Sequence, residues 1–334
     1  MIIKKILLSL LLIISIAFSS QTLAEIKSSR VVNNFINTMV KKHRFSQKEL
    51  KKLFKSAKIK KSILKAISRP AEGRMTWHKY RQIFMTEARI SGGVNFWRQH
   101  RTVLANVEQK YGVPWPIIVA IIGVETQYGG NTGSYRVIDA LSTLAFAYPK
   151  RSKFFTSELE NFLLLCREEK INPLKPKGSY AGAMGLPQFM PSSFRKHAAD
   201  YEMDKHRNIW TNPADAIASV GNYLQQYGWA RGQGIAYPVS ASGTAYTKAL
   251  SKDLKPNVTL AQLQALHVQI PAGLPLQSPA KLLDFKQANG KELWVGLNNF
   301  YVITRYNHSR LYAMAVYQLS MAISTKVETL ARGY

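Results

Sequence analysis

The sequence contains a single cysteine and few acidic residues. One thiol cannot form an intramolecular disulfide, and it excludes metal sites that need two or more cysteines. Asp and Glu number 19 against 46 Lys and Arg, so the chain carries a formal charge of +27. This excess predicts an anionic partner: nucleic acid, an anionic membrane surface or an acidic polymer.

Several catalytic motifs are also missing. The sequence has no GxSxG, GxGxxG, P-loop, HExxH or CxxC pattern, and its 7 histidines show no metal-ligand spacing. The lone thiol, Cys166, follows four apolar residues and is predicted to be a buried hydrophobe. With 46% hydrophobic and 19% charged residues, the composition excludes a disordered chain, a collagen-like fibre and a polytopic membrane protein. A length of 334 residues predicts two or three domains.

The N-terminal segment predicts the compartment. Two lysines precede an apolar run from Ile6 to Phe18, which is shorter than the ~20 residues needed to span a bilayer. Small residues at Thr22 and Ala24 suit a cleavage site, so we expect a signal peptide over residues 1–24 and export to the bacterial periplasm. An uncleaved anchor is the alternative. No cysteine lies near the junction, which excludes lipid attachment at a lipobox, and export argues against nucleic acid as the partner.

The positive charge is concentrated in the first part of the exported chain. Residues 25–110 hold 21 Lys and Arg against 5 Asp and Glu. Ser46 and Glu49 have the spacing of a helix capping box, and apolar residues follow at helical spacing with lysines on the other face, at positions 51, 52, 55 and 58. Two interpretations stay open: a solvated helix face, or a surface that holds the protein near a polyanion by salt-dependent attraction.

The exported chain is expected to be mainly α-helical. The pattern divides it into a basic helical domain at 25–105, a helical catalytic core at 106–231 plus 296–334, and a small strand-and-loop insertion at 232–295. Proline is frequent in the insertion. Residues 292–306 are expected to be a strand or an extended loop, and residues 310–330 a helix.

One carboxylate lies in an unusual position. Residues 117–124 are almost wholly apolar and predict a buried helix that begins at Pro116 and ends near Glu125. Glu125 follows Ile118 and Ile121 by seven and four residues and therefore shares their face. Desolvation on that face is expected to raise its pKa and allow it to act as a general acid near neutral pH. The alternative is a side chain that emerges at the helix end and bonds exposed groups.

A second unusual stretch, residues 177–193, is rich in small residues. Small side chains let a ligand approach the backbone closely, while Ser179 and Gln188 offer short polar contacts. Aromatic residues are frequent from Tyr180 to Tyr312. Aromatic faces, amides and hydroxyls suit a saccharide groove, although core packing explains many of these rings equally well.

Three motifs in order give a specific resemblance. Residues 123–129, 178–193 and 305–309, with Tyr148–Arg151 between the first two, resemble the lytic murein transglycosylase B family from about Val94 to Leu319. The resemblance implies a lysozyme-like helical core. It further implies cleavage of the bond between N-acetylmuramic acid and N-acetylglucosamine in peptidoglycan without water, which leaves a 1,6-anhydromuramoyl end.

The resemblance also implies roles for individual residues. Glu125 would be the single general acid and base, and Ser179 would contact the N-acetyl region. The other implied groove contacts are Tyr80, Gln188, Tyr306, Asn307 and Tyr312, while Lys150 and Arg151 would pair with peptide or lactyl carboxylates. The nearest other acids, Asp139, Glu158 and Glu160, are expected to be capping or helix-surface residues.

Members of this family can carry a calcium loop. The equivalent run here offers Asp200, Glu202, Asp204, His206 and Asp215 as ligands. However, the sixth loop position is Lys205 rather than glycine, and the twelfth is Thr211 rather than glutamate. A structural Ca²⁺ and a metal-free polar loop both stay open, and the reaction is expected to require no cofactor.

The main hypothesis is therefore a monomeric periplasmic lytic transglycosylase. Its expected partners are peptidoglycan glycan strands and an anionic membrane surface, with no nucleic acid. A muramidase that hydrolyses the same bond, and a noncatalytic peptidoglycan-binding protein, are the alternatives.

Overall fold

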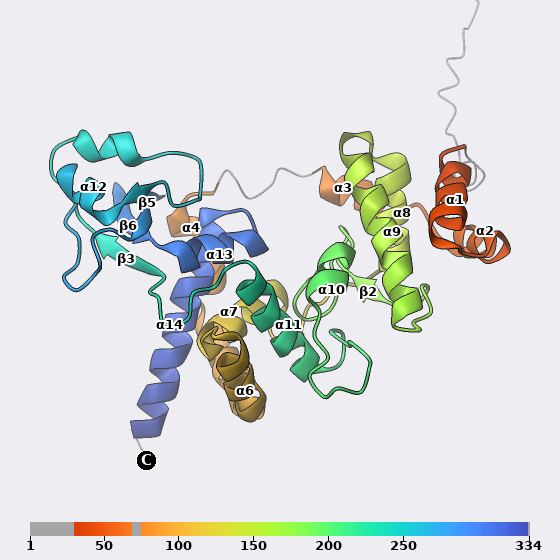
Figure 1. Ribbon diagram of the computed structural model, residues 1–334, viewed down its shortest axis with the longest axis horizontal. Coiled ribbons are helices and arrows are strands. Elements are labelled where there is room, and N and C mark those ends of the chain that lie inside the picture. Colours follow the sequence, from red (N-terminus) through yellow and green to blue (C-terminus); the bar gives the residue numbers. More distant parts are fainter. Residues whose placement is uncertain (1–29, 69–74, 333–334) are drawn as a thin grey trace, which may run out of the picture. The chain divides into compact units, whose positions relative to one another are not determined.

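A computed structural model describes residues 30–68 and 75–332, which fall into two compact units (Figure 1). The first unit ends at Ile59 and the second begins at Lys60. Residues 60–105, which the sequence assigned to the basic helical domain, therefore belong to the larger unit. The signal peptide expected over residues 1–24 lies outside the described residues.

The described part of the first unit is a pair of helices, α1 (Arg30–His43) and α2 (Gln47–Ser56). The ring of Phe54 meets that of Phe35 edge-on, with 5.7 Å between the ring centroids. At the start of α2 the Ser46 hydroxyl accepts a hydrogen bond from the Glu49 backbone N–H at 3.3 Å, as the capping spacing predicts. The expected amphipathic pattern is confirmed, because Leu50 and Phe54 are buried while the lysines at 51, 52, 55 and 58 are exposed.

The larger unit is mainly helical, as expected. Its helices are α3 (Lys61–Ile67), α4 (Trp77–Phe84), α5 (Glu87–Gln99), α6 (Arg101–Tyr111), α7 (Trp115–Thr126), α8 (Val137–Ala147), α9 (Ser152–Glu168), α10 (Pro191–His197), α11 (Pro213–Gln226), α12 (Leu260–Ala265), α13 (Asn298–Tyr306) and α14 (Arg310–Arg332). Two short 3-10 helices, η3 (Pro149–Arg151) and η4 (Ala245–Ala249), lie between them.

Helix α7 is the centre of this unit. Every residue from Ile117 to Gly123 is buried, which an apolar helix achieves only when other elements surround it. Its neighbours are α5, α6, α11 and α14. The thiol of Cys166 is also buried, which raises its pKa well above the ordinary range, so the expected inert role of this cysteine is confirmed.

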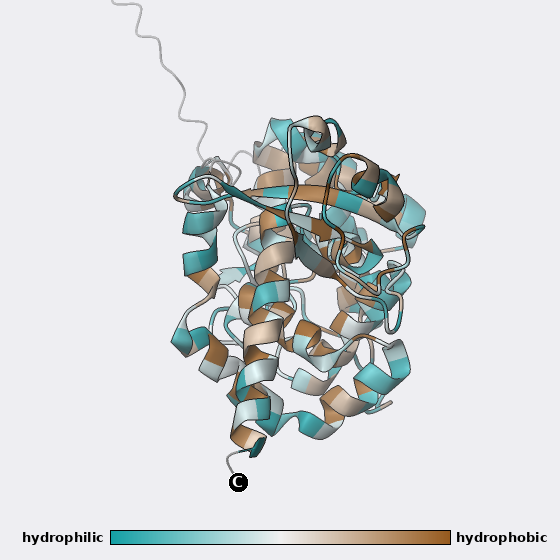
Figure 2. Ribbon diagram, turned by 90° about the vertical axis from the view of Figure 1, so that its left-hand side faces the viewer, coloured by the Kyte–Doolittle hydropathy of each residue, from teal (hydrophilic) through white to brown (hydrophobic). Residues whose placement is uncertain are grey.

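The longest helix, α14, packs along both α5 and α7. Apolar and polar residues alternate along it, as the ribbon that ends at the C-terminal label in Figure 2 shows. Its buried residues include Val316, Leu319 and Ile323. This spacing of three and four residues matches the helix predicted over 310–330.

The strand-rich segment forms a four-stranded antiparallel sheet. The strands are ordered β3 (Ala236–Val239), β6 (Lys291–Gly296), β5 (Pro279–Lys286) and β4 (Val258–Thr259). Leu282 and Val295 face each other across β5 and β6 and join a small hydrophobic core with α12 residues such as Leu260 and Leu263. The strands expected in the insertion are therefore present.

The expectation of a strand or extended loop over 292–306 is wrong in its second half. The strand β6 ends at Gly296, and residues 298–306 form α13. Phe300 and Ile303 are buried and lie three residues apart while Arg305 is exposed, so helical packing rather than alternation sets this segment.

A two-residue ribbon positions the loops of the candidate site. β1 (Tyr135–Arg136) pairs with β2 (Lys177–Gly178), with Tyr135 opposite Gly178. The ribbon brings the turn before residue 135 beside the small-residue stretch that starts at 177. Gly133, at φ +90°, lies against the Gly178 backbone so closely that a Cβ would overlap it.

Asn299 is predicted to be essential for stability. Its fully buried amide accepts from the Ala230 backbone N–H at 2.8 Å and donates to the carbonyls of Ala230 and Gln233, both at 2.9 Å. Asn299→Ala leaves these buried groups without partners and should lower the free energy of unfolding by about 2–4 kcal/mol in chemical denaturation. The control is Asn298→Ala, which removes one exposed hydrogen bond to Gly228 and should cost less than about 1 kcal/mol. Equal losses in the two variants would contradict this role.

Candidate active site

Helix α7 ends next to the candidate catalytic carboxylate. Gln127 and Tyr128 adopt the left-handed conformation, at φ +51° and +60°, and stop the helix just after Glu125. The Thr126 hydroxyl donates to the carbonyl of Leu186 at 2.9 Å. The end of α7 is thereby attached to the loop that carries the second motif.

A half-buried arginine also holds this helix end. Arg89 of α5 donates to the carbonyl of Gly123, and the Tyr128 hydroxyl donates to the Arg89 carbonyl at 2.8 Å. A cation at a helix C-terminus is favoured by the helix dipole. A side chain at position 123 would lie 2.6 Å from the Tyr128 ring, so this glycine is required for the packing. Glu125 therefore stands on a fixed backbone.

Glu125 faces a polar cavity of about 550 Å³. The cavity is lined by Glu125, Gly130, Asn131, Thr132, Gly133, Ser134, Tyr135, Ser179, Tyr180 and Gln188. Three residues expected at the site, Glu125, Ser179 and Gln188, are thus brought together. The Asn131–Tyr135 turn was missed, although its glycines and small polar residues are the same signal that identified residues 177–193.

Two side chains hold the loops around the cavity. The Gln188 amide donates to the carbonyl of Thr132 at 3.2 Å and to that of Gly185 at 2.9 Å, which joins the two walls. The Ser179 hydroxyl accepts from the Ala183 backbone N–H at 3.0 Å. Both side chains are half-buried at the cavity, and the Ser179 hydroxyl keeps its proton to donate to a ligand.

Two tyrosines support the carboxylate from behind. The Tyr312 hydroxyl donates to Glu125 Oε1 at 2.7 Å. The ring of Tyr306 stacks nearly parallel to that of Tyr312, 6.4 Å away, and its hydroxyl donates to the Pro187 carbonyl at 2.6 Å. Burial raises the pKa of both phenols, and the charge of Glu125 raises it further. Both hydroxyls therefore stay protonated and act as donors.

The remaining expected contacts do not line the cavity. Tyr80 is buried in α4, where its ring packs 5.1 Å from that of Phe84, and it lies close enough to Tyr312 to raise the pKa of that phenol. Asn307 is exposed at the end of α13. Lys150 and Arg151 are exposed in η3, with the Arg151 guanidinium 4.4 Å from the Phe154 ring centroid.

The acids nearest to Glu125 in sequence are occupied elsewhere. Asp139 is buried and accepts two hydrogen bonds from Arg136, at 2.8 and 2.9 Å. Glu158 is buried and accepts from the backbone N–H and the hydroxyl of Ser192, at 2.9 and 2.7 Å, at the start of α10. Among the described residues, Glu125 is the one carboxylate that lines the cavity. The cavity therefore offers a single carboxyl group for acid–base chemistry.

The candidate calcium loop makes hydrogen bonds within itself. The Asp200 carboxylate accepts from the backbone N–H groups of Asp204 and Lys205 at 3.2 and 2.7 Å. The buried Asp215 carboxylate accepts from those of Tyr201 and Asn208 at 2.8 and 2.7 Å. Burial raises the pKa of Asp215, and the charges of Glu202 and Asp200 add to this.

Other carboxylates of the loop also accept hydrogen bonds within it. The Glu202 carboxylate accepts from the Asn212 amide at 2.8 Å, and the Asp204 carboxylate accepts from the His206 backbone N–H at 2.8 Å. Within residues 30–68 and 75–332, no three His, Cys, Asp or Glu side chains are grouped to hold a metal ion.

Known proteins share this sequence and fold. Residues 27–321 match the transglycosylase SLT domain family. The chain is 43% identical over 305 residues to the membrane-bound lytic murein transglycosylase B of Escherichia coli strain K12, which covers 87% of this chain and 81% of that protein.

Two solved structures are similar to the whole arrangement. The catenated lytic transglycosylase SltB1 of Pseudomonas aeruginosa is 49% identical, with a TM-score of 0.87 over 90% of this chain and 99% of that one. The lytic transglycosylase Slt35 of Escherichia coli, solved in complex with calcium, is 42% identical, with a TM-score of 0.81 over 89% of this chain and 94% of that one.

Proposed function

The chain belongs to the transglycosylase SLT domain family and is a lytic murein transglycosylase with a lysozyme-like helical core; we propose that Glu125 is its catalytic acid and base. Enzymes of this kind cleave the bond between N-acetylmuramic acid and N-acetylglucosamine and leave a 1,6-anhydromuramoyl end. The observation that carries the proposal is the single carboxylate in the cavity, bonded to Tyr312.

The geometry suits a reaction with an internal nucleophile. Glycosidases that use water or a covalent intermediate normally need two carboxylates at a defined separation. With one carboxylate, a group on the substrate must attack the anomeric carbon. The muramoyl 6-hydroxyl can do so, and the neighbouring N-acetyl group can stabilise the positive charge that develops there.

Each proton in this scheme passes through Glu125. The protonated carboxyl gives its proton to the leaving glycosidic oxygen as the bond to C1 breaks. The resulting carboxylate then accepts the proton of the 6-hydroxyl as that oxygen bonds to C1, which restores the acid. Tyr312 donates to Oε1 throughout and leaves Oε2 to carry the proton.

The polar lining of the cavity would orient the sugar rings. Ser179 and Gln188 supply a hydroxyl and an amide beside Glu125, and Ser179 is assigned to the N-acetyl group. Tyr180 is 40% exposed and offers an aromatic face to a sugar ring. Tyr80 and Tyr306 act by packing behind Tyr312, whereas the exposed Asn307, Lys150 and Arg151 would meet substrate beyond the cavity.

The test of this function is Glu125→Gln. The amide keeps the shape of the side chain but cannot give or take the proton, so the release of soluble fragments from purified sacculi should fall by at least about 10³-fold, with normal folding. Digestion by Glu125→Gln at the wild-type rate would show that cleavage does not use this residue.

Tyr312→Phe should lower kcat about 10- to 100-fold with little change in KM, because it removes a hydrogen bond that holds Glu125 without touching substrate.

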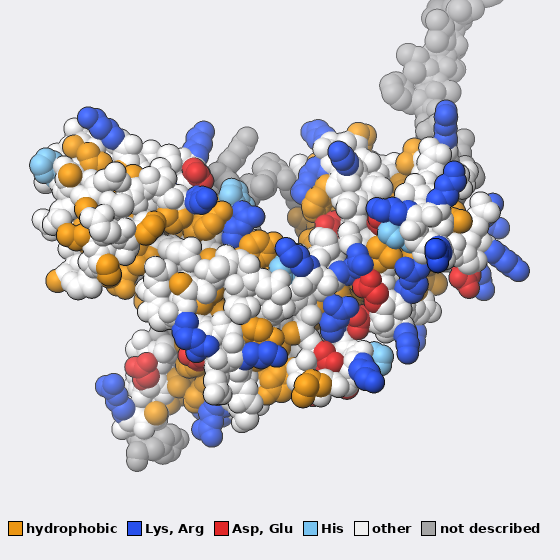
Figure 3. All heavy atoms as spheres, in the orientation of Figure 1, with side chains coloured by type: hydrophobic (Ala, Val, Ile, Leu, Met, Phe, Trp, Pro, Cys, Tyr) orange, Lys and Arg blue, Asp and Glu red, His pale blue; other side chains and the backbone are white. Residues whose placement is uncertain are grey.

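We propose that the enzyme works in the periplasm, held near an anionic surface by its first unit. Residues 30–59 contain one acid, Glu49, against lysines and arginines at positions 30, 41, 42, 44, 48, 51, 52, 55 and 58. Figure 3 shows the blue side chains of Lys and Arg over α1 and α2. Within the described residues no helix is long and apolar enough to cross a membrane. Electrostatic attraction to the acidic cell wall or to anionic lipid would then hold the protein in place.

Removing four lysines should separate retention from catalysis. The quadruple variant K48Q/K51Q/K52Q/K55Q loses four positive charges of the first unit. At about 0.1 M salt, where charges interact over only ~10 Å, it should bind sacculi and anionic vesicles several-fold more weakly than the wild type. Its cleavage of short soluble glycan fragments should be unchanged. The control replaces four exposed lysines of the larger unit, at 170, 175, 248 and 255. Equal loss of binding in both variants would show that only net charge matters.

We propose that the Asp200–Asp215 loop keeps its structure without calcium. Its carboxylates already bond backbone N–H groups, and Lys205 places a positive charge where calcium loops have glycine. Slt35 was solved in complex with calcium, so the two proteins are expected to differ in their response to calcium.

Thermal unfolding with calcium or with a chelator tests this difference. Millimolar Ca²⁺ should move the midpoint by less than about 2 °C, because a ligand stabilises only a fold that binds it. A rise of several degrees that Asp200→Asn abolishes would contradict the proposal and make the loop a calcium site.

A further inference from the structure

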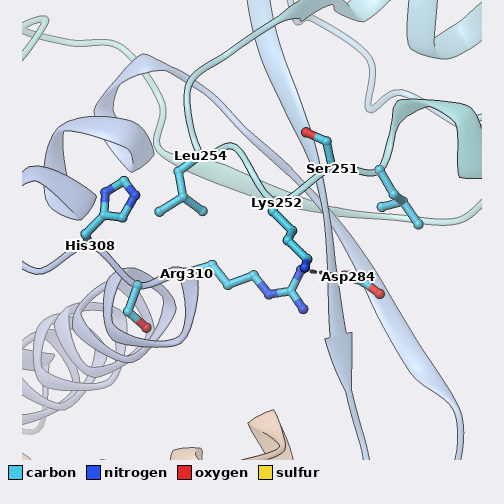
Figure 4. A pocket seen from close by; sticks show the side chains of 8 residues that line it. Ser251, Lys252, Leu254, Asp284, His308 and Arg310 are labelled. Carbon is cyan, nitrogen blue, oxygen red and sulfur yellow. Dashed lines mark hydrogen bonds and ion pairs between the residues drawn. The ribbon is translucent and has the colours of Figure 1, made fainter. Parts of the chain in front are cut away.

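A second cavity, of about 400 Å³, lies outside the candidate active site (Figure 4). Three parts of the larger unit line it: the loop after η4, strand β5, and the turn between α13 and α14. The lining residues are Leu250, Ser251, Lys252, Leu254, Asp284, His308, Ser309 and Arg310. We call it the Lys252–Arg310 pocket.

Positive charge predominates in this pocket. Arg310 Nη1 forms an ion pair with Asp284 Oδ1 at 2.6 Å, drawn as a dashed line in Figure 4. This pair orients the guanidinium and leaves its other N–H groups available. Within the described residues, the Lys252 ammonium has no hydrogen bond or ion pair. Figure 4 shows Lys252 pointing toward Arg310 and Asp284, so two cations and one anion converge there.

Two leucines also line the pocket. Leu254 is buried, and Leu250 is half-buried. A ligand for this pocket therefore carries a carboxylate or similar anion next to a small apolar group. The hydroxyls of Ser251 and Ser309 add short polar contacts.

A buried lysine fixes the loop that forms the pocket. Lys281 of β5 is only 1% exposed and donates to the Ser251 hydroxyl and to Asn257 Oδ1, the latter at 3.3 Å. Lys281 itself pairs with Gly296 of β6, so the loop is attached to a strand in the sheet interior. A pocket held in this way loses little conformational entropy when it binds a ligand.

The pocket and the active site share one helical turn. Arg310 and Tyr312 both lie at the start of α14, and their Cα atoms are separated by less than about 8 Å because consecutive Cα atoms are about 3.8 Å apart. Tyr312 faces Glu125 of α7, whereas Arg310 faces Asp284 of β5. The pocket therefore lies beside the start of the helix whose Tyr312 holds Glu125.

We propose that the Lys252–Arg310 pocket binds a carboxylate of the stem peptide that peptidoglycan carries on muramic acid. This inference rests on the proposed function. Stem peptides carry free carboxylates beside alanine methyl groups, which match the two cations and the two leucines of the pocket. A peptide of four residues spans up to about 14 Å when extended, so its carboxylates can bind away from the sugar that carries it.

The experiment compares glycan strands that carry stem peptides with the same strands after an amidase has removed them. Lys252→Ala should lower kcat/KM about three- to tenfold on the peptide-bearing strands, mainly through KM, because one charge-assisted contact is lost. On the stripped strands it should change kcat/KM less than about twofold. Lys252→Arg should restore most of the loss, since it keeps the charge.

Lys255→Ala is the matched control, because Lys255 is exposed in the same loop and does not line the pocket. It should behave as wild type on both substrates. An equal effect of Lys252→Ala on the two substrates, or no effect on either, overturns the assignment of the pocket. Failure of the wild type to cleave either substrate would instead contradict the proposed function.

Discussion

The hydrogen bond from Tyr312 to Glu125 joins two helices that are distant in sequence, and the active site depends on it. It holds the carboxylate at the edge of a polar cavity while α7 remains surrounded by apolar neighbours. Thr126, Arg89 and Tyr128 then fix the backbone beneath it. Helix α7 is buried from Ile117 to Gly123 and so presents its carboxylate near its end, one residue before it stops.

The excess of positive charge is separate from this chemistry. The cavity contains one carboxylate and no lysine or arginine among its lining residues, whereas the described residues of the first unit are strongly basic. We propose the same physical property, attraction to anions, for two places. In the first unit it would act weakly over a wide surface, and in the Lys252–Arg310 pocket it would act locally, where an ion pair orients one of the two cations.

Local patterns predicted the helices and the carboxylate well. The apolar run before Glu125 and the lysines on one face of α2 are patterns that extend over one or two helical turns, so the sequence alone reveals them. Tyr312 was expected at the groove only by resemblance, because its bond to Glu125 spans 187 residues. The wrong expectation for residues 298–306 had a similar cause. Packing of Phe300 and Ile303 against distant elements decides that segment, and local alternation does not show it.

The central claim is that one carboxylate works with a nucleophile supplied by the substrate. Digestion of purified sacculi in water labelled with oxygen-18, followed by mass analysis of the fragments, tests it most directly. The account predicts 1,6-anhydromuramoyl ends, each lighter by one water than a reducing end, with no label incorporated. Reducing ends that carry the label would show that water is the nucleophile and would contradict the account.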